Sequence, residues 1–487
     1  MPTLRSFDIF DTIVARRCVH PHNIFRAVEA RAGQPGFAEA RVQAEATLYR
    51  AGEYTLDDIY GLLQTSFGLS AVTAKYLQSI ELSEEFDNFI PIRKHIVEVR
   101  PGDLLICDMY LPLDFIKRVV QRKCGLYFNP IYLSAHGKSS GSAWTLLTGL
   151  ADIEEHTGDN AHSDVDMANR HGVKGRRSVV SNMTPHEILV ETLGFGKLAH
   201  ATRAARLALW SSDPEKQRLA ETQSGVNFST LFLTCLLLVN LAIHKGWKRI
   251  LFSSRDCFNL YALFERVAER VGLDIEAEYF FTSRVARTAP SPAYLNYFNQ
   301  LCGSGPVGVV DICGTGWSLT RLFEAAGRPE TEMFFVHRID DPALMNAYRK
   351  IAAIGREPNI TSLVSTGNNV IFEALNATDH PMVSDVLEAN GTFIPTYLDI
   401  KTTPRYDELV RWSAEAFSTA AASTDLIDTQ EILRWLSVVR VEHVARLYQA
   451  MSQQLEAVSG IVSQMLTENG PAMAMISDRV ASAPGRS

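Results

Sequence analysis

The chain has 487 residues, of which 46% are hydrophobic and 21% are charged, so it predicts two or three globular domains without extensive disorder. Lys and Arg number 47 against 55 Asp and Glu, and the formal charge of −8 excludes a bulk electrostatic attraction to nucleic acid or to an anionic membrane. The seven cysteines are scattered without a Cys-x-x-Cys pair, which favours reduced thiols over disulfides or zinc. Since no signal-peptide pattern is visible and the apolar stretch at 228–243 is short for a membrane span, we expect a cytoplasmic protein with no transmembrane segment.

The first predicted strand ends in acidic residues. Residues 6–14 form an apolar run that includes Asp8, Asp11 and Thr12. A carboxylate at the carboxyl end of a buried strand lies where open α/β sheets bind ligands. Asp8 is therefore the first candidate site residue, although a lone aspartate at a strand end is also a common helix cap.

Helical periodicity then predominates from about residue 16 to residue 97. The predicted helices cover 22–32, 37–49, 55–67 and 71–90. Thr55 followed by Asp58 is a capping signal for the third of these helices. The pattern predicts a helical insertion between the first and second strands of a sheet.

Strands alternate with helices after this insertion, which is typical of a Rossmann-like, doubly wound parallel sheet in the α/β class. The predicted strands cover 103–108, 130–134, 154–157 and 177–180, and the predicted helices cover 113–123, 141–150 and 163–170. We expect this first domain to span 1–195.

A second α/β domain is predicted over 196–400. It begins with helices over about 200–245, and its predicted strands lie at 248–256, 276–281 and 307–311, with a helix at 257–271. Helical periodicity returns near residue 406, so 401–487 is predicted to be a helical C-terminal region.

Four separated segments, each near a predicted strand end, carry residues suited to phosphoryl transfer. In chain order they contain Asp8 with Thr12, then Cys107, then Lys138, and finally Asp159 with Asp164. With this order the chain resembles the haloacid dehalogenase superfamily, and the helical insertion resembles the C1 cap of that superfamily. The resemblance covers residues 1–195 and implies a cap that closes over an active site at the sheet edge.

The resemblance also implies a role for each of these residues. Asp8 is expected to be the nucleophile that forms an aspartyl-phosphate. Lys138 is expected to offset the charges of nucleophile and phosphate, and Thr12 and Cys107 to lie at the phosphate position, where a thiol is a weak donor. The implied Mg²⁺ ligands are Asp8, the backbone carbonyl of Phe10, Asp159 and Asp164.

Phe10 departs from the family pattern. Phosphatases of the family carry an aspartate two residues after the nucleophile as general acid and base, and a phenyl ring transfers no proton. Three interpretations stay open: the substrate has a good leaving group, Asp11 or a cap residue supplies the proton, or the domain binds a phosphorylated ligand without turnover. Strand alternation aims Asp11 away from Asp8 unless the turn has already begun.

The second domain has its own candidate site. Residues 307–319 predict a strand, a glycine-rich turn and a helix, which either directs backbone N–H groups at an anion or is a tight connection. This segment loosely resembles the phosphoribosyl-diphosphate loop of type I phosphoribosyltransferases. Residues near the ends of neighbouring strands either form a buried ion pair or share a pocket with the loop. The candidates are Arg255, Asp256, Arg284, Asp311, Thr315, Gly316 and Ser318.

Both α/β domains together resemble two-domain members of the superfamily associated with surface-polysaccharide biosynthesis. The resemblance implies a Mg²⁺-dependent hydrolase of a phosphorylated small molecule, with sugar phosphates as the favoured class and glycan-biosynthesis proteins as partners. The alternatives are a catalytically impaired module that binds a phosphorylated ligand in glycan biosynthesis, or a second domain that acts like a phosphoribosyltransferase.

Overall fold

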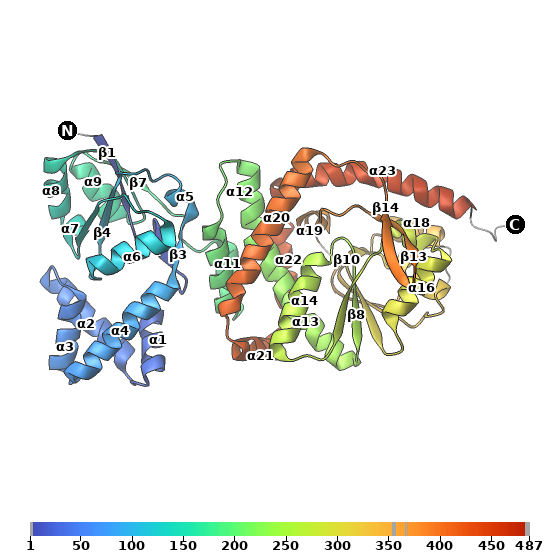
Figure 1. Ribbon diagram of the computed structural model, residues 1–487, viewed down its shortest axis with the longest axis horizontal. Coiled ribbons are helices and arrows are strands. Elements are labelled where there is room, and N and C mark those ends of the chain that lie inside the picture. Colours follow the sequence, from blue (N-terminus) through green and yellow to red (C-terminus); the bar gives the residue numbers. More distant parts are fainter. Residues whose placement is uncertain (1–2, 353–356, 366, 368, 483–487) are drawn as a thin grey trace. The chain divides into compact units, whose positions relative to one another are not determined.

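The computed structural model of the chain describes residues 3–352, 357–365, 367 and 369–482. It divides the chain into two compact units, of which the first comprises 1–184 with 203–210 and the second comprises 185–202 with 211–487. Each unit contains a five-stranded parallel sheet, and helices connect the strands (Figure 1). The predicted α/β class with a doubly wound first sheet is confirmed.

The sheet of the first unit has the strand order β5-β4-β1-β6-β7. From the central strand the chain builds outward to β4 and β5 and then returns to add β6 and β7 on the other side. The order therefore reverses between β1 and β6. The bounds are β1 (Thr3–Asp8), β4 (Leu104–Asp108), β5 (Ile131–Ser134), β6 (Asp152–Gly158) and β7 (Lys174–Arg177).

The prediction of a last strand at 177–180 is wrong by about three residues. The strand at the sheet edge is the polar segment Lys174–Arg177, and its partner is β6. The apolar residues that suggested the later position do not join the sheet: Val179 is exposed, while Val180 packs against a separate cluster around β2 and β3.

Helices cover both faces of the first sheet. Phe7 and Leu105 pack on the face that α6 covers, and Ile106 and Ile153 pack on the opposite face with α8 and α9. The helices of this part are α5 (Arg93–Ile96), α6 (Leu113–Cys124), α7 (Gly137–Ser140), α8 (Ser142–Leu150) and α9 (Met167–Arg170).

The predicted helical insertion is present as a four-helix cap. Its helices are α1 (His22–Ala32), α2 (Phe37–Ala51), α3 (Leu56–Phe67) and α4 (Ala71–Asn88). They gather below the sheet of the first unit in the view of Figure 1 (dark to mid blue). Thr55 and Asp58 form the predicted capping box. The chain enters and leaves the cap through two short antiparallel strands, β2 (Val14–Arg16) and β3 (Phe89–Pro91).

The sheet of the second unit has the order β12-β11-β10-β8-β9, and all neighbouring strands are parallel. The chain places β9 on one side of β8 and then adds β10 on the other side, so the order reverses between β8 and β10. The bounds are β8 (Arg249–Ser253), β9 (Glu276–Phe280), β10 (Val307–Gly314), β11 (Glu332–Arg338) and β12 (Ile360–Val364).

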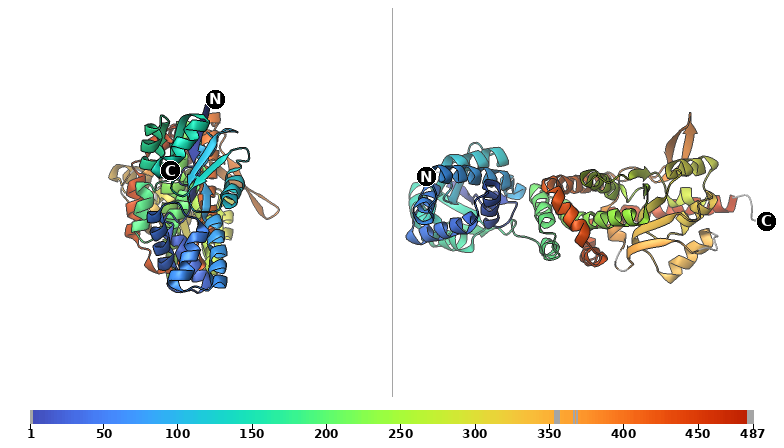
Figure 2. Two further views of the ribbon diagram at one scale, coloured as in Figure 1. Left: turned by 90° about the vertical axis from the view of Figure 1, so that its left-hand side faces the viewer. Right: turned by 90° about the horizontal axis from the view of Figure 1, so that it is seen from below.

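Helices α16 and α17 pack on one face of this sheet, and α13 and α14 lie on the other. A hairpin of β13 (Val383–Ala389) and β14 (Thr392–Tyr397) extends from the body of the unit (Figure 2). The remaining helices are α10 (Pro185–Thr192), α11 (Gly196–Ala208), α12 (Pro214–Glu221), α13 (Phe228–Lys245), α14 (Phe258–Val271), α15 (Arg284–Thr288), α16 (Pro292–Cys302), α17 (Trp317–Ala325), α18 (Pro342–Ala352), α19 (Asn369–Leu375), α20 (Pro404–Ser423), α21 (Thr429–Val438), α22 (Val441–Met451) and α23 (Ser459–Ser482).

One helical run of the described chain, Pro214–Lys245, is long and apolar enough by length and composition to cross a membrane. However, 72% of its most apolar window is buried inside the structure. Its C-terminal part, α13, packs against α14 and α22, as a core helix does.

Candidate metal centre

Three aspartates meet at the carboxyl edge of the first sheet. Asp8 ends β1, Asp159 directly follows β6, and Asp164 lies in a short π-helix, Ala161–Asp166. One carboxylate oxygen from each residue lies within 4.8 Å of the others. Since β1 and β6 flank the point where the strand order reverses, these residues lie where open α/β sheets bind ligands. We call them the acidic centre.

The backbone around Asp164 fixes the position of its carboxylate. The N–H of Asn160 donates a hydrogen bond of 2.9 Å to Oδ2 of Asp164, and the Asn160 side chain caps the π-helix. A Cβ at residue 158 would lie 2.3 Å from Cγ of Asp164. Glycine at 158 is therefore needed for the Asp164 side chain to occupy this space.

Lys138 connects two of the three carboxylates. Its Nζ donates to Oδ1 of Asp8 at 2.5 Å and to Oδ1 of Asp164 at 2.6 Å. The backbone N–H of Lys138 donates to Asp108 at the end of β4, so the strand next to β1 positions the lysine. Burial alone would lower the pKa of Lys138, but the charges of Asp8 and Asp164 raise it, and the ammonium stays charged.

Burial and crowding oppose the ionisation of the acidic centre. Burial raises the pKa of Asp8. The positive charge of Lys138 lowers this pKa, whereas the negative charges of Asp164 and Asp159 raise it, and the pKa stays above its usual range. Burial, Asp11 and Asp164 together raise the pKa of Asp159 to about 7. Burial also acts against ionisation of Asp164, but Lys138 holds the pKa of that carboxyl below its usual range. With one lysine for three carboxylates, the fully ionised centre carries two uncompensated negative charges.

This donor set fits a divalent cation. Mg²⁺ and Ca²⁺ take oxygen ligands, and carboxylates are the charged ligands that they prefer. A cation with two positive charges compensates the excess charge of Asp8, Asp159 and Asp164. The carbonyl of Phe10, the other expected ligand, belongs to the segment that leaves β1, and its role in metal binding stays a prediction.

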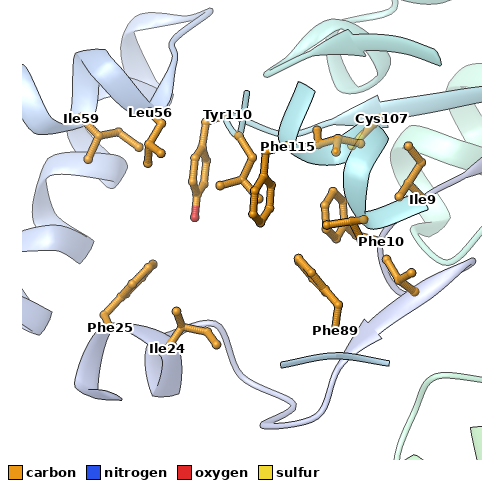
Figure 3. Close-up of a cluster of buried hydrophobic side chains, with 14 of the residues drawn as sticks. Ile9, Phe10, Ile24, Phe25, Leu56, Ile59, Phe89, Cys107, Tyr110 and Phe115 are labelled. Carbon is orange, nitrogen blue, oxygen red and sulfur yellow. The ribbon is translucent and has the colours of Figure 1, made fainter. Parts of the chain in front are cut away.

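The side chain of Phe10 lies in a hydrophobic cluster and not among the carboxylates. Its ring packs against that of Phe89 with centroids 5.1 Å apart, and only 8% of the residue is exposed (Figure 3). The cluster joins residues of the first sheet, α6 and the cap. Phe10 is thus part of the packing between the sheet and the entrance to the cap.

Asp11 has already left the strand alternation. Its backbone is left-handed, with φ of 56°, and its N–H donates to the carbonyl of Val14 at 2.6 Å. The Asp11 side chain is 42% exposed, and its negative charge contributes to the raised pKa of Asp159. Desolvation by the surrounding residues raises the pKa of Asp11, and the positive charges of Arg16 and Arg203 lower it only in part. The turn therefore leaves Asp11 near the acidic centre and open to solvent.

Thr12 and Cys107 border the acidic centre in different ways. The buried Thr12 hydroxyl donates to Oδ2 of Asp8 at 3.3 Å. Cys107 is fully buried in the hydrophobic cluster, and burial followed by the charge of Asp8 raises the pKa of its thiol. Cys107 is accordingly a protonated, packed side chain.

His156 belongs to this site, although the sequence pattern did not single it out as a site residue. It is fully buried, its Nδ1 lies 2.8 Å from the Ser6 hydroxyl, and its Nε2 lies 3.4 Å from Oδ1 of Asp164. His156 precedes Gly158 by two residues in β6, so the two residues lie on the same side of the strand. Burial lowers the pKa of His156, so the neutral ring orients Asp164 without adding charge.

The candidate residues of the second domain are also brought together. All of them line one cavity of about 190 Å³ in the second unit. The residues are Arg255, Asp256, Arg284, Asp311, Thr315, Gly316 and Ser318. Three charged residues of this cavity, Arg287, Glu373 and Glu468, were not predicted. The spacing of three residues between Arg284 and Arg287 is the only sequence signal for any of them.

No protein-family model matches the chain, and a search of curated proteins finds no match either.

Proposed function

We propose that the first unit is a Mg²⁺-dependent phosphohydrolase of the haloacid dehalogenase superfamily, acting on a phosphorylated small molecule. The observation that carries the proposal is the contact of Lys138 with both Asp8 and Asp164, beside Asp159, at the edge where β1 and β6 end. In this proposal the nucleophile, a cation and the metal ligands share one site in the unit that carries the helical cap. Sugar phosphates are the favoured class, on the resemblance to proteins of surface-polysaccharide biosynthesis.

Asp8 is the proposed nucleophile. One carboxylate oxygen of Asp8 attacks the phosphorus, and the bond from phosphorus to the leaving oxygen breaks. Water then attacks the aspartyl-phosphate, which releases phosphate and restores the carboxylate. Lys138 and Thr12, both bonded to Asp8, hold its carboxylate in one orientation. A Mg²⁺ held by Asp8, Asp159 and Asp164 would lower the repulsion between the anionic carboxylate and the anionic phosphate.

Asp11 is the proposed proton carrier in place of Phe10. A carboxyl with a raised pKa holds a proton that the leaving alkoxide takes, and the resulting carboxylate then takes a proton from the attacking water. Its partial exposure and its charge interaction with Asp159 support this role. We expect residues of the cap to determine which leaving groups are accepted.

The competing function is binding of a phosphorylated ligand without turnover. It is supported by the packing of Phe10 against Phe89, which leaves no proton carrier at the position that phosphatases use. In this case the acidic centre and Lys138 bind a metal and a phosphate, but Asp8 does not react.

Turnover assays with a panel of phosphorylated sugars, with Mg²⁺ or with a chelator, separate these functions. We expect Mg²⁺-dependent release of phosphate by the wild type and none by Asp8→Asn. The matched control is Asp152→Asn, which changes an exposed aspartate at the start of β6 and should leave the rate unchanged. No Asp8-dependent turnover on any substrate, together with Mg²⁺-dependent binding of the same phosphates, would establish the binding function instead.

A further inference from the structure

The second unit contains a cavity at the position that corresponds to the acidic centre of the first unit. Its walls come from the ends of β8 and β10, between which the strand order reverses, and from α15, α17, α19 and α23. Ligands of open α/β sheets bind at this position. The cavity volume of about 190 Å³ is below the range of roughly 300–1,000 Å³ for drug-sized ligands, so it suits a small molecule.

One wall of the cavity is the glycine-rich turn before α17. Gly316 has φ of 82°, and it precedes the helix without any side-chain capping bond. The first N–H groups of an α-helix have no partner within the helix, so those of Trp317 to Leu319 are available to an acceptor. A Cβ at residue 316 would lie 2.5 Å from Ile360, which requires glycine at this position.

The side chain of Thr315 in this wall lacks a partner among the described residues. Thr315 is only 8% exposed and lines the cavity, and its hydroxyl makes no hydrogen bond within the described chain. A buried donor without an acceptor costs about 1–3 kcal/mol, so this hydroxyl favours a ligand that supplies an acceptor oxygen.

Arginines add positive charge next to this turn. Arg287 lines the cavity and donates to Oδ2 of Asp311 at 3.0 Å, so Asp311 positions the guanidinium. Arg284, one turn earlier on α15, is exposed and lines the same cavity, which places it where the cavity meets solvent. A turn with free N–H groups beside two arginines is suited to a phosphate.

Carboxyl groups also line the cavity and make it more than an anion site. The carboxyl of Asp256 makes no hydrogen bond or ion pair with any residue that the structure describes, and Glu373 accepts a hydrogen bond from Asn369 only. Burial and the charge of Glu373 raise the pKa of Asp256 to about 8. Carboxyls in this state accept and donate hydrogen bonds, as the hydroxyl groups of a polyol require.

We propose that this cavity binds a small phosphorylated polyol, such as a sugar phosphate. Its phosphate lies at the turn Thr315–Ser318 beside Arg284 and Arg287, and its hydroxyl groups lie at Asp256 and Glu373. This binding site is separate from the acidic centre and does not depend on the hydrolase function proposed for the first unit. Asp311 holds Arg287 and therefore acts as a positioning residue.

Calorimetric titration of the full chain tests the proposal. The probes are ribose phosphate, ribose and inorganic phosphate, in the presence of a chelator and in an Asp159→Asn background, so that binding at the acidic centre is suppressed. We expect ribose phosphate to bind more tightly than inorganic phosphate, and ribose to bind weakest. Equal affinity for ribose and ribose phosphate, or no saturable binding of ribose phosphate, would overturn the proposal.

Variants assign the binding to the cavity. Arg284→Gln should weaken both phosphate and ribose phosphate by about tenfold, since a charge-assisted hydrogen bond is lost. Asp256→Asn should weaken ribose phosphate more than inorganic phosphate, because it changes a group proposed to bind the hydroxyl groups. Arg434→Gln, which removes an exposed arginine paired with Glu431 on α21, is the matched control and should change neither affinity. If neither Arg284→Gln nor Thr315→Val changes the affinity for ribose phosphate, the ligand binds elsewhere and the proposal is contradicted.

Discussion

The ring of Phe10 packs against the ring of Phe89, with their centroids 5.1 Å apart and their planes inclined by 48°. Phe10 follows Asp8 by two residues, and Phe89 is the first residue of β3, where the chain returns from the cap. The guanidinium of Arg16 lies over both rings, at 5.6 Å and 5.4 Å from their centroids. Phe10 therefore connects the segment that leaves β1 to the base of the cap.

Replacing Phe10 by aspartate should destabilise the first unit and not create a better phosphatase. The change removes a buried ring, for which Phe→Ala costs about 3–5 kcal/mol, and adds a carboxylate to an apolar cluster. Phe10→Leu should cost less, because it keeps an apolar side chain. Urea unfolding measures the difference, and Phe128→Asp, at a residue that is 78% exposed, is the control. A folded Phe10→Asp variant with raised phosphatase activity would show that the ring has no packing role.

Asp11→Asn should lower turnover in a way that depends on the leaving group. Loss of a general acid reduces the rate by roughly 10²–10⁴-fold for an alkyl phosphate, whose leaving alkoxide needs a proton. An acyl phosphate, which leaves as a stable carboxylate, should react at nearly the wild-type rate. Turnover rates of both substrates by the wild type and the variant measure this dependence. Equal losses of rate on the two substrates would exclude Asp11 as the proton donor.

Asp159 should make both stability and Mg²⁺ binding depend on pH. Its pKa is about 7 in the folded chain against an ordinary value of 3.8, so between these values the folded state holds a proton that the unfolded chain has lost. This contribution to the free energy of unfolding is therefore largest near pH 4, falls as the pH rises to about 7, and is constant above. Mg²⁺ competes with the same proton, so the increase of Tm by Mg²⁺ should be larger at about pH 8 than at about pH 5. Thermal melts of wild type and Asp159→Asn test this, and an equal Mg²⁺ effect at both pH values would contradict it.

Much of the first unit follows from local sequence patterns. The cap helices, the Thr55 capping box and the alternation of strands and helices are signalled within a few residues, because capping and periodicity are local properties. The meeting of Asp8 with Asp159 also follows, since parallel strands end at one edge of a sheet.

Contacts between distant segments could not be read in the same way. The pairing of β2 with β3 joins three-residue strands that lie on either side of the whole cap, and neither strand is long enough to show a period. Phe10 lies beyond the end of β1 at Asp8, where strand alternation no longer predicts the direction of a side chain. In the second unit, β11, β12 and the hairpin of β13 and β14 had no predicted counterpart. The partner of Arg255 is Glu468 of α23, 213 residues later, so sequence spacing gave no indication of this pair.

The ion pair of Arg41 and Glu81 should be a strong stabilising element of the cap only while both partners are present. Two hydrogen bonds of 2.9 Å and 2.8 Å join them, and both side chains are fully buried. Arg41→Met should cost about 3–5 kcal/mol, because it leaves the buried Glu81 charge uncompensated. The double variant Arg41→Met with Glu81→Leu should regain most of that loss.

Urea unfolding of the single and double variants measures this coupling. The matched control in the same cap is Arg31→Met, which breaks the ion pair of Arg31 with Glu84. Since the Arg31 side chain is 53% exposed, this substitution should lower the free energy of unfolding by less than about 1 kcal/mol. Additive effects of the Arg41 and Glu81 substitutions would contradict the expected coupling.

Gly158→Ala should disable the acidic centre by changing the position of one carboxylate. The added Cβ would lie 2.3 Å from Cγ and from Oδ2 of Asp164, so the Asp164 side chain has to move out of its present place. We expect a loss of about 1–3 kcal/mol from this overpacking and the disappearance of the Tm increase by Mg²⁺. The control is Gly149→Ala, where a Cβ would meet nothing within 4 Å, and where alanine in helix α8 should stabilise by about 0.5–1 kcal/mol. Thermal melts with and without Mg²⁺ compare the two variants, and a full Mg²⁺ effect in Gly158→Ala would mean that Asp164 is not a metal ligand.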